Sequence, residues 1–271
     1  EWADQAGKTV EGSPTQAFLL GHPRSGTTLI EQALDAHPDL ISADETSMFH
    51  NAVWMPTVLQ KGNSPDVYGE TLATAGPNYV RRLSKDYRVR WSRTTDGASK
   101  SRQILLDKNP ALTTRLAVIA RFFPEAPIVF ALRDPRDVVL SSFMQPVGVN
   151  DWSINWLSLE DTVDYYCFSM QMWIDLRDKL PNRCIEVRYE DCVENLTAEA
   201  KKATTHLGLD WNKAQEDVRK HVSTKLVFSP TYGDVGKKVY RSSVARWKHY
   251  QQRLEPHLSK LEPFVKAFGY E

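Results

Sequence analysis

Several features are scarce or missing in this sequence, and each absence excludes a class of protein. The 271 residues include only three cysteines, Cys167, Cys184 and Cys192, which form neither a C-x-x-C pair nor a zinc-ligand spacing. We therefore expect reduced thiols in a cytoplasmic protein rather than a disulfide scaffold. No apolar run is long enough to span a bilayer, and no signal-like segment stands at the start, which argues against an integral membrane protein.

An excess of charge of one sign is also missing. Lysine plus arginine and aspartate plus glutamate number 34 each, so the formal net charge is +0 and the pI is about 7.3. This balance argues against binding to nucleic acid or to a membrane surface through bulk electrostatics and leaves room for local basic sites. Hydrophobic residues make up 41% of the chain, which is enough for one large α/β core or two small ones. Because the sequence begins with glutamate rather than methionine, we expect a trimmed or excised domain.

Short apolar runs alternate with segments of helical spacing, which predicts an α/β fold with a mainly parallel sheet. Strands are expected at residues 17–20, 40–42, 104–106, 128–132 and 184–187. Helices are expected at residues 48–60, 67–90, 111–123 and 159–180. Residues 1–15 are expected to be an irregular lead-in to a single domain over residues 16–271, which contains a basic loop at residues 222–242.

The most informative segment is the loop GHPRSGTT that joins the first strand to a helix. Strand, small-residue loop and helix together direct backbone N–H groups at an anion. Gly21 and Gly26 have the spacing of a Walker P-loop, and Thr28 could supply its hydroxyl. The lysine position of that motif is Thr27, however, and the cation is Arg24 within the loop. A planar arginine suits a phosphosulfate better than a magnesium-bound triphosphate, so the pattern favours a phosphate or sulfate ester as ligand.

Other charged and polar residues stand where predicted strands end. Arg24, Lys108, Arg133 and Tyr189 each follow the carboxyl end of a strand. Ligands of parallel sheets lie beyond these ends. The sequence therefore predicts one shared anionic site at this edge of the sheet.

A set of motifs distributed over residues 17–250 resembles one enzyme family. The motifs are G-x-P-R-S-G-T-T-L, D-A-H-P, x-E-T, D-K-N-P, L-R-D-P-R-D-x-x-x-S, R-Y-E-D and S-S-x-x-R-W. They resemble those of the sulfotransferases that use PAPS (3′-phosphoadenosine 5′-phosphosulfate), in particular the tyrosylprotein sulfotransferases and the bacterial sulfotransferase domains attached to tetratricopeptide repeats. The resemblance implies a P-loop-like three-layer α/β fold with PAPS as co-substrate and a hydroxyl-bearing acceptor, which could be a small molecule, glycan, lipid or peptide. It also implies that the full-length chain could contain a tetratricopeptide region.

The resemblance implies a complete donor site. The residues that would cradle the 5′-phosphosulfate are Pro23, Arg24, Ser25, Gly26, Thr27 and Thr28. Arg133 and Ser141 would hold the 3′-phosphate, and Tyr189 would lie near the adenosine. Arg246 falls where relatives carry a basic residue on a C-terminal loop that closes over the nucleotide.

The resemblance also implies the catalytic groups. Glu45 matches the general base, and Lys108, together with Arg24, would stabilise charge on the departing phosphate during in-line attack at sulfur. A hydroxyl from the C-terminal loop completes the site in relatives, and Thr231 is the best match, with Ser229 as the alternative. This scheme requires no metal.

Each of these assignments has a simpler alternative. Glu45 could cap the helix expected to follow it, and Lys108 or Arg133 could be solvated charges at strand ends. Asp44 is the rival to Glu45 as base, and we expect only one of the two neighbours to face the site. Arg136 and Asp137 are expected to form a surface pair. Core packing is expected for most of the tryptophans Trp152, Trp156 and Trp173.

Departures from the family pattern bear on the compartment and on the acceptor. Golgi tyrosylprotein sulfotransferases carry cysteines where this chain has Ala43 and Asp107, so that disulfide cannot form. Relatives that sulfate acidic peptides carry arginines where this chain has Ser47 and Asn51, so a neutral acceptor is expected. A nucleotide kinase or NTPase and a non-catalytic PAPS-binding protein remain as rival functions, and the oligomeric state is left open.

Overall fold

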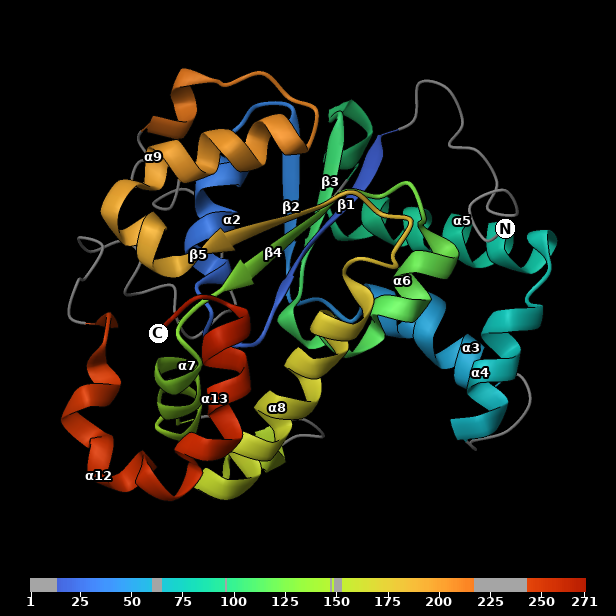
Figure 1. The fold of residues 1–271 in the computed structure, drawn as a ribbon. Helices are drawn as coiled ribbons and strands as arrows, with labels where there is room; N and C mark the ends of the chain where they lie inside the picture. Colours follow the sequence, from blue (N-terminus) through green and yellow to red (C-terminus); the bar gives the residue numbers. More distant parts are fainter. Residues whose placement is uncertain (1–13, 60–64, 96, 147, 149–152, 217–242) are drawn as a thin grey trace.

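A parallel sheet forms the centre of the computed structural model, which describes residues 14–59, 65–95, 97–146, 148, 153–216 and 243–271. Its strands in this part of the chain are β1 (Thr15–Gly21), β2 (Leu40–Asp44), β3 (Ile104–Lys108), β4 (Ile128–Leu132) and β5 (Cys184–Arg188). They lie in the order β2-β3-β1-β4-β5, and all neighbouring pairs are parallel. The carboxyl ends of the strands therefore meet at one edge (Figure 1), and the predicted α/β fold is confirmed.

Helices connect the strands and cover both faces of the sheet. The longer ones are α2 (Thr27–Asp35), α4 (Pro65–Thr74), α5 (Pro77–Thr94), α6 (Leu116–Phe122), α7 (Pro135–Phe143), α8 (Leu159–Leu176), α9 (Tyr189–His206) and α13 (Leu258–Ala267). Shorter helices and helical turns are η1 (His50–Trp54), α3 (Met55–Leu59), η2 (Ala98–Ser101), η3 (Pro110–Arg115), η4 (Ser153–Trp156), η5 (Lys213–Glu216), η7 (Arg246–Tyr250), α12 (Gln251–Leu254) and η8 (Glu255–His257). Among the described residues, no helix is both long and apolar enough to cross a membrane.

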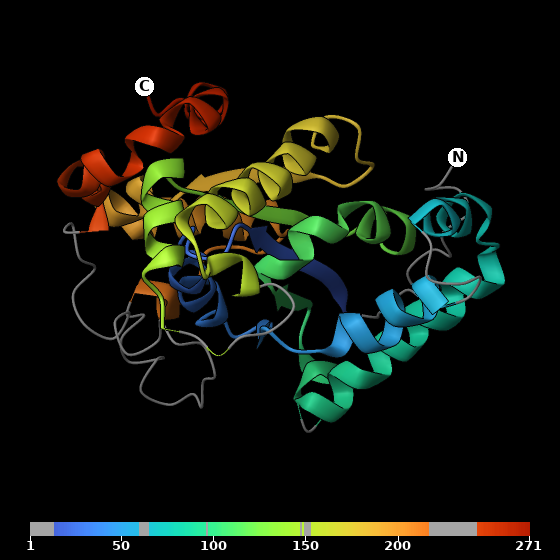
Figure 2. The ribbon, with the colours of Figure 1, turned by 90° about the horizontal axis from the view of Figure 1, so that it is seen from below.

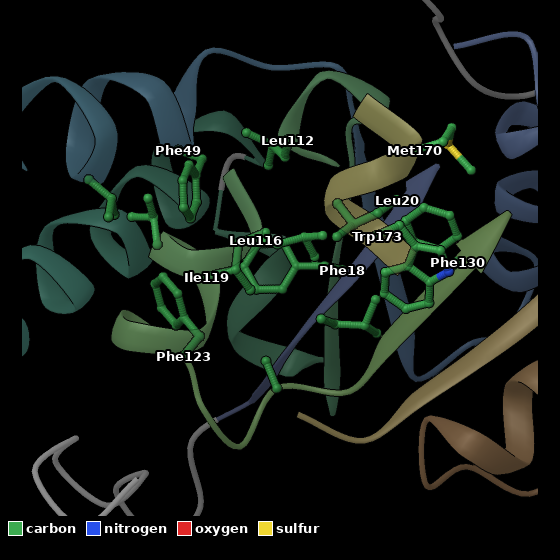
Figure 3. Packing of buried hydrophobic residues seen from close by; sticks show 14 of the residues in the cluster. Phe18, Leu20, Phe49, Leu112, Leu116, Ile119, Phe123, Phe130, Met170 and Trp173 are labelled. Carbon is green, nitrogen blue, oxygen red and sulfur yellow. The ribbon is translucent and has the colours of Figure 1, made fainter. Parts of the chain in front are cut away.

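Two hydrophobic cores lie on opposite faces of the sheet because successive strand residues point to opposite sides. Leu19 of β1 belongs to the core formed with α2 and α9, whereas its neighbour Phe18 packs with α5, α6, α8 and α13. Figure 2 shows α2 and α8 on opposite sides of the sheet. In the second core, Phe130 of β4 stacks on Trp173 of α8 with ring centroids 3.7 Å apart (Figure 3). Trp173 thus packs in the core as expected.

Some element boundaries differ from those expected from the sequence. The predicted helix at 111–123 is the turn η3 followed by α6, and the helix predicted to reach residue 180 ends at Leu176. The strand predicted at 40–42 continues to Asp44, which pairs with Lys108 in the ladder. Residue Glu45 then leaves the strand in the left-handed region, with φ 48°, and does not begin a helix. Residues 1–13, Trp152 and the loop 222–242 lie outside the described residues.

Candidate active site

The predicted anion-binding loop connects β1 to α2 at the carboxyl edge of the sheet. Gly26 is the N-cap of α2 with φ 89°, and the first turn of the helix contains no acidic residue. A Cβ at Gly26 would stand 2.5 Å from Cδ2 of Tyr189, so glycine is required both by the backbone and by the close approach of this ring. The N–H groups of a first helical turn have no partners within the helix. The N-terminus of α2 is therefore suited to bind an anion.

Two arginines and a serine meet beside this loop. Nε of Arg24 donates a hydrogen bond to Oγ of Ser141 on α7 (3.2 Å), and Arg133 donates to the carbonyl oxygen of Arg24 (3.0 Å). Arg133 is buried, which excludes a solvated strand-end charge. Its Nε atom is buried and has no hydrogen-bond partner among the described residues. The structure thus brings together the predicted phosphate-binding residues Arg133 and Ser141, and Arg24 links them.

Tyr189 closes this group on the side of β5. It is the first residue of α9, and the Arg133 guanidinium lies over its ring at 4.7 Å from the centroid. The same ring contacts the loop at Gly26. Tyr189 therefore offers an aromatic surface next to the two positions predicted to hold anions.

A C-terminal segment lies against the same arginine. Arg133 donates a hydrogen bond to the carbonyl oxygen of Ser243 (2.7 Å). The backbone N–H of Trp247 donates to Oδ1 of Asp137 on α7 (2.7 Å). These two bonds attach residues 243–247 to the edge of the predicted nucleotide site. Arg246, in this segment, is exposed, and its guanidinium is 3.9 Å from Sδ of Met144.

The expectation of a surface pair between Arg136 and Asp137 is wrong. Asp137 is 1% exposed, and Arg136 instead pairs with Asp134 at 2.7 Å while its guanidinium lies over the Trp247 ring at 4.1 Å. Burial raises the pKa of Asp137, against the lowering effect of Arg133 and of the bond from Trp247. The sequence offered no local signal for the hydrogen bond between Trp247 and Asp137, because these two residues are 110 positions apart.

Lys108 ends β3, and three carboxylates lie within ion-pair distance of its Nζ atom. Its side chain is 0% exposed, so the alternative of a solvated strand-end lysine is wrong. Nζ donates a hydrogen bond to Oε1 of Glu45 (2.8 Å), also contacts Asp44, and lies 3.8 Å from Oε2 of Glu31. Burial opposes the charge of Lys108, but the carboxylates of Glu45, Glu31 and Asp44 outweigh burial and hold its pKa above the ordinary value.

Both candidate bases face this lysine, so the expectation that only one of Asp44 and Glu45 could do so is wrong. Glu45 has φ 48°, and its N–H donates to the carbonyl oxygen of Lys108 (2.9 Å). This turn brings its carboxylate to the same atom as that of Asp44. The two differ in access: the side chain of Glu45 is 36% exposed and that of Asp44 8%. Glu45 pairs with Lys108 and is the more accessible of the two carboxylates.

The two positions where Golgi relatives carry cysteines are partners in the β2–β3 ladder, as Ala43 and Asp107. Asp107 is 0% exposed, and the hydroxyl of Tyr87 donates to its Oδ2 at 2.6 Å. Burial raises the pKa of Asp107 to about 7, against the lowering effects of Tyr87 and Lys108. All three cysteines of the chain are free.

Ser47 and Asn51, the two positions that the resemblance contrasts with enzymes acting on acidic peptides, are neutral and exposed. The Asn51 side chain donates a hydrogen bond to Oγ of Ser47 (3.1 Å).

Trp156 is buried. The predicted hydroxyl donors Thr231 and Ser229 lie outside the described residues, and their assignment stays a prediction.

Comparisons with known proteins agree with this geometry. The sequence matches the family described as "Sulfotransferase family" over residues 16–213. An uncharacterized protein of Aquifex aeolicus is 25% identical over 258 residues, which cover 92% of this chain and 32% of that protein. Protein-tyrosine sulfotransferase A of Caenorhabditis elegans is 21% identical over 267 residues, covering 94% of this chain and 67% of that protein. The chain thus spans about a third of the first relative and about two thirds of the second.

Solved structures share the fold. The sulfotransferase domain of the Synechococcus PCC 7002 olefin synthase superposes with a TM-score of 0.58 at 20% identity, covering 90% of this chain and 91% of that one. A mouse sulfotransferase complexed with PAP (3′-phosphoadenosine 5′-phosphate) has a TM-score of 0.50 at 10% identity, covering 97% and 88%. The family match spans well over half of the sequence, from before the anion-binding loop to beyond α9. The chain belongs to the sulfotransferase family.

Proposed function

We propose that the chain transfers a sulfuryl group from PAPS to an acceptor hydroxyl. The observation that carries this proposal is the pairing of Lys108 with the accessible Glu45 at the sheet edge that holds the anion-binding loop, in a chain of the sulfotransferase family. A cation and a reachable carboxylate beside an anion cradle supply charge stabilisation and a base. Relatives named protein-tyrosine sulfotransferases and a structural neighbour complexed with PAP support the same reaction.

The described residues fit PAPS as donor substrate. The residues that hold its 5′-phosphosulfate are Pro23, Arg24, Ser25, Gly26, Thr27 and Thr28. Arg133 and Ser141 hold its 3′-phosphate. The buried Nε of Arg133 has no hydrogen-bond partner among the described residues and would donate to this phosphate. Tyr189 provides a flat surface for the adenine. Arg246 stands on the segment that lies against Arg133 and would close over the nucleotide.

The reaction is a single in-line displacement at sulfur. The acceptor oxygen forms a bond to sulfur while the bond between sulfur and the bridging phosphate oxygen breaks, and PAP leaves with the electron pair. Glu45 takes the proton of the acceptor hydroxyl. Lys108 and Arg24 stabilise the negative charge that develops on the departing phosphate. Because protein cations supply this stabilisation, the reaction requires no metal.

We further propose that the acceptor is a neutral alcohol or phenol rather than an acidic tyrosine peptide. Ser47 and Asn51 are exposed, bond to each other and carry no charge. An acidic peptide would need cations at these positions. Efficient sulfation of a Glu/Asp-rich tyrosine peptide, in competition with neutral phenols and alcohols, would overturn this part of the proposal. The three free cysteines support a cytoplasmic location, and a tetratricopeptide region would lie outside the present sequence.

Turnover of labelled PAPS with a panel of acceptors tests the proposed reaction. We expect activity in the presence of a chelator, and we expect Glu45→Gln to lower kcat by about 10²–10⁴-fold, the usual value of general-base catalysis, with PAP affinity unchanged. Asp44→Asn is the matched comparison, since it removes the neighbouring carboxylate. Loss of activity in Asp44→Asn alone would exchange the roles of the two residues. Magnesium-dependent transfer from ATP would favour a kinase, and PAP binding without turnover on any acceptor would favour a binding protein.

A further inference from the structure

A buried carboxylate on α2 faces the proposed catalytic lysine, and no step of the reaction above uses it. Glu31 is 0% exposed, and its Oε2 lies 3.8 Å from Nζ of Lys108. Its other oxygen accepts a hydrogen bond from Oγ of Ser42 on β2 (2.6 Å). Glu31 stands four residues after Thr27, one turn into the helix whose N-terminus belongs to the anion-binding loop. It therefore connects this helix to the lysine.

The charges around Lys108 differ in how they can change during the reaction. The groups that face it are Glu31 from α2 and Asp44 and Glu45 from the end of β2. Glu45 is the most exposed of the three carboxylates paired with the lysine and accepts the proton of the substrate. Glu31 has no access to water, so leaving its charge without a counter-ion would cost far more than at the surface.

We propose that Glu31 is a positioning residue. It provides a negative counter-charge for Lys108 when Glu45 becomes protonated and its ion pair with the lysine weakens. When Glu45 takes the acceptor proton it loses its charge, and its attraction for Lys108 weakens. Nζ of Lys108 can then donate to the bridging oxygen, which gains negative charge as the bond to sulfur breaks. Glu31 and Asp44 stay in place as counter-charges, so the lysine shifts its hydrogen bond without leaving a buried charge unpaired. This inference rests on the proposed function.

Loss of the Glu31 charge should affect the chemical step and leave nucleotide binding intact. In Glu31→Gln the positive charge of Lys108 is shared by fewer carboxylates, so its ion pair with Glu45 tightens. Lys108 then shifts less readily to the bridging oxygen, and we expect kcat to fall by roughly tenfold.

The experiment compares Glu31→Gln with Asp35→Asn, which removes a second carboxylate from the same helix. Asp35 is 8% exposed and accepts a hydrogen bond from the backbone of Ser42 (2.6 Å), which asparagine can keep. Measurements are kcat, PAP affinity by calorimetry, and thermal unfolding. We expect Asp35→Asn to retain wild-type kcat and Glu31→Gln to lower it by roughly tenfold, with PAP affinity within about twofold for both.

A folded Glu31→Gln variant with wild-type kcat would overturn the proposal. If that variant does not fold, Ser42→Ala decides, because it removes the bond that orients Glu31 and keeps the charge: a several-fold loss of kcat at unchanged PAP affinity is expected, and no loss would overturn the inference. A wild-type chain without turnover on any acceptor would instead refute the proposed function. The two failures are therefore distinguishable.

Discussion

Asp107 provides a measurable link between the site and the stability of the fold. Its carboxyl group is buried and accepts a hydrogen bond from Tyr87, and burial raises its pKa from 3.8 to about 7. The folded protein therefore binds this proton more tightly than the unfolded chain does. The resulting stabilisation is complete below about pH 4 and is lost as the pH rises through about 7.

The size of this effect follows from the two pKa values. At 1.36 kcal/mol for each pH unit, the difference between 3.8 and about 7 corresponds to about 4 kcal/mol, of which about 2–3 kcal/mol is lost between pH 5 and pH 8. Asp107→Asn keeps the shape of the side chain and cannot ionise. Relative to the variant, the wild-type chain should therefore lose about 2–3 kcal/mol of unfolding free energy over this interval.

Urea unfolding at pH 5, 6, 7 and 8, followed by tryptophan fluorescence, measures this difference. Tyr87→Phe provides a second arm, because the hydrogen bond from Tyr87 lowers the pKa of Asp107. Its removal should extend the loss of stability to higher pH. A difference between wild type and Asp107→Asn that stays constant within about 0.5 kcal/mol from pH 5 to 8 would refute the reasoning, since an uncoupled carboxyl group has already ionised by pH 5.

Three further predictions concern nucleotide binding, each measured by calorimetry with PAP. Arg133→Ala should weaken binding by roughly ten- to a hundredfold with or without magnesium, because a charge-assisted hydrogen bond contributes about 1.5–3 kcal/mol; equal affinity for PAP and ATP would count against a 3′-phosphate clamp. Gly26→Ala should abolish tight binding because its Cβ would meet Tyr189, whereas Gly208→Ala, with φ 85° and open space around it, should keep wild-type affinity and lose only about 1 kcal/mol of stability. Asp137→Ala should release Trp247 and weaken binding several-fold, and unchanged affinity would show that the C-terminal segment is held by other contacts.

Local patterns in the sequence were sufficient for most of the fold. The strand at residues 128–132 was predicted with its observed limits because an apolar run bounded by a proline and by charged residues has few other solutions. Pro135 begins α7 as expected, since a proline is favoured in the first helical turn. Helix ends were less accurate, as at Leu176, because fraying and tertiary contacts set the last turn.

Residues next to strand ends were predicted from their position in the sequence, and Ser141 on α7 was predicted through the resemblance. Lys108 and Arg133 are found at the expected edge, but their burial and partners depend on contacts between distant segments. The pairing of Asp137 with Trp247 and that of Glu31 with Lys108 join residues that carry no mutual signal in the sequence. Glu31, Asp137 and Trp247 lie on helices or helical turns. Packing between distant elements brings these residues to their partners, and periodicity along one element cannot reveal which of them meet.

Backbone strain in the described part of the chain gathers at the proposed site. Arg24, Glu45 and Ala245 are the non-glycine residues with positive φ among the described residues, a conformation that costs about 1 kcal/mol or more for each. Arg24 belongs to the anion-binding loop, Glu45 pairs with Lys108, and Ala245 precedes Arg246 on the segment that lies against Arg133. None of the three belongs to either hydrophobic core. Such strain persists only where surrounding contacts impose it, and here those contacts direct the proposed base, the loop cation and the C-terminal segment to one edge of the sheet.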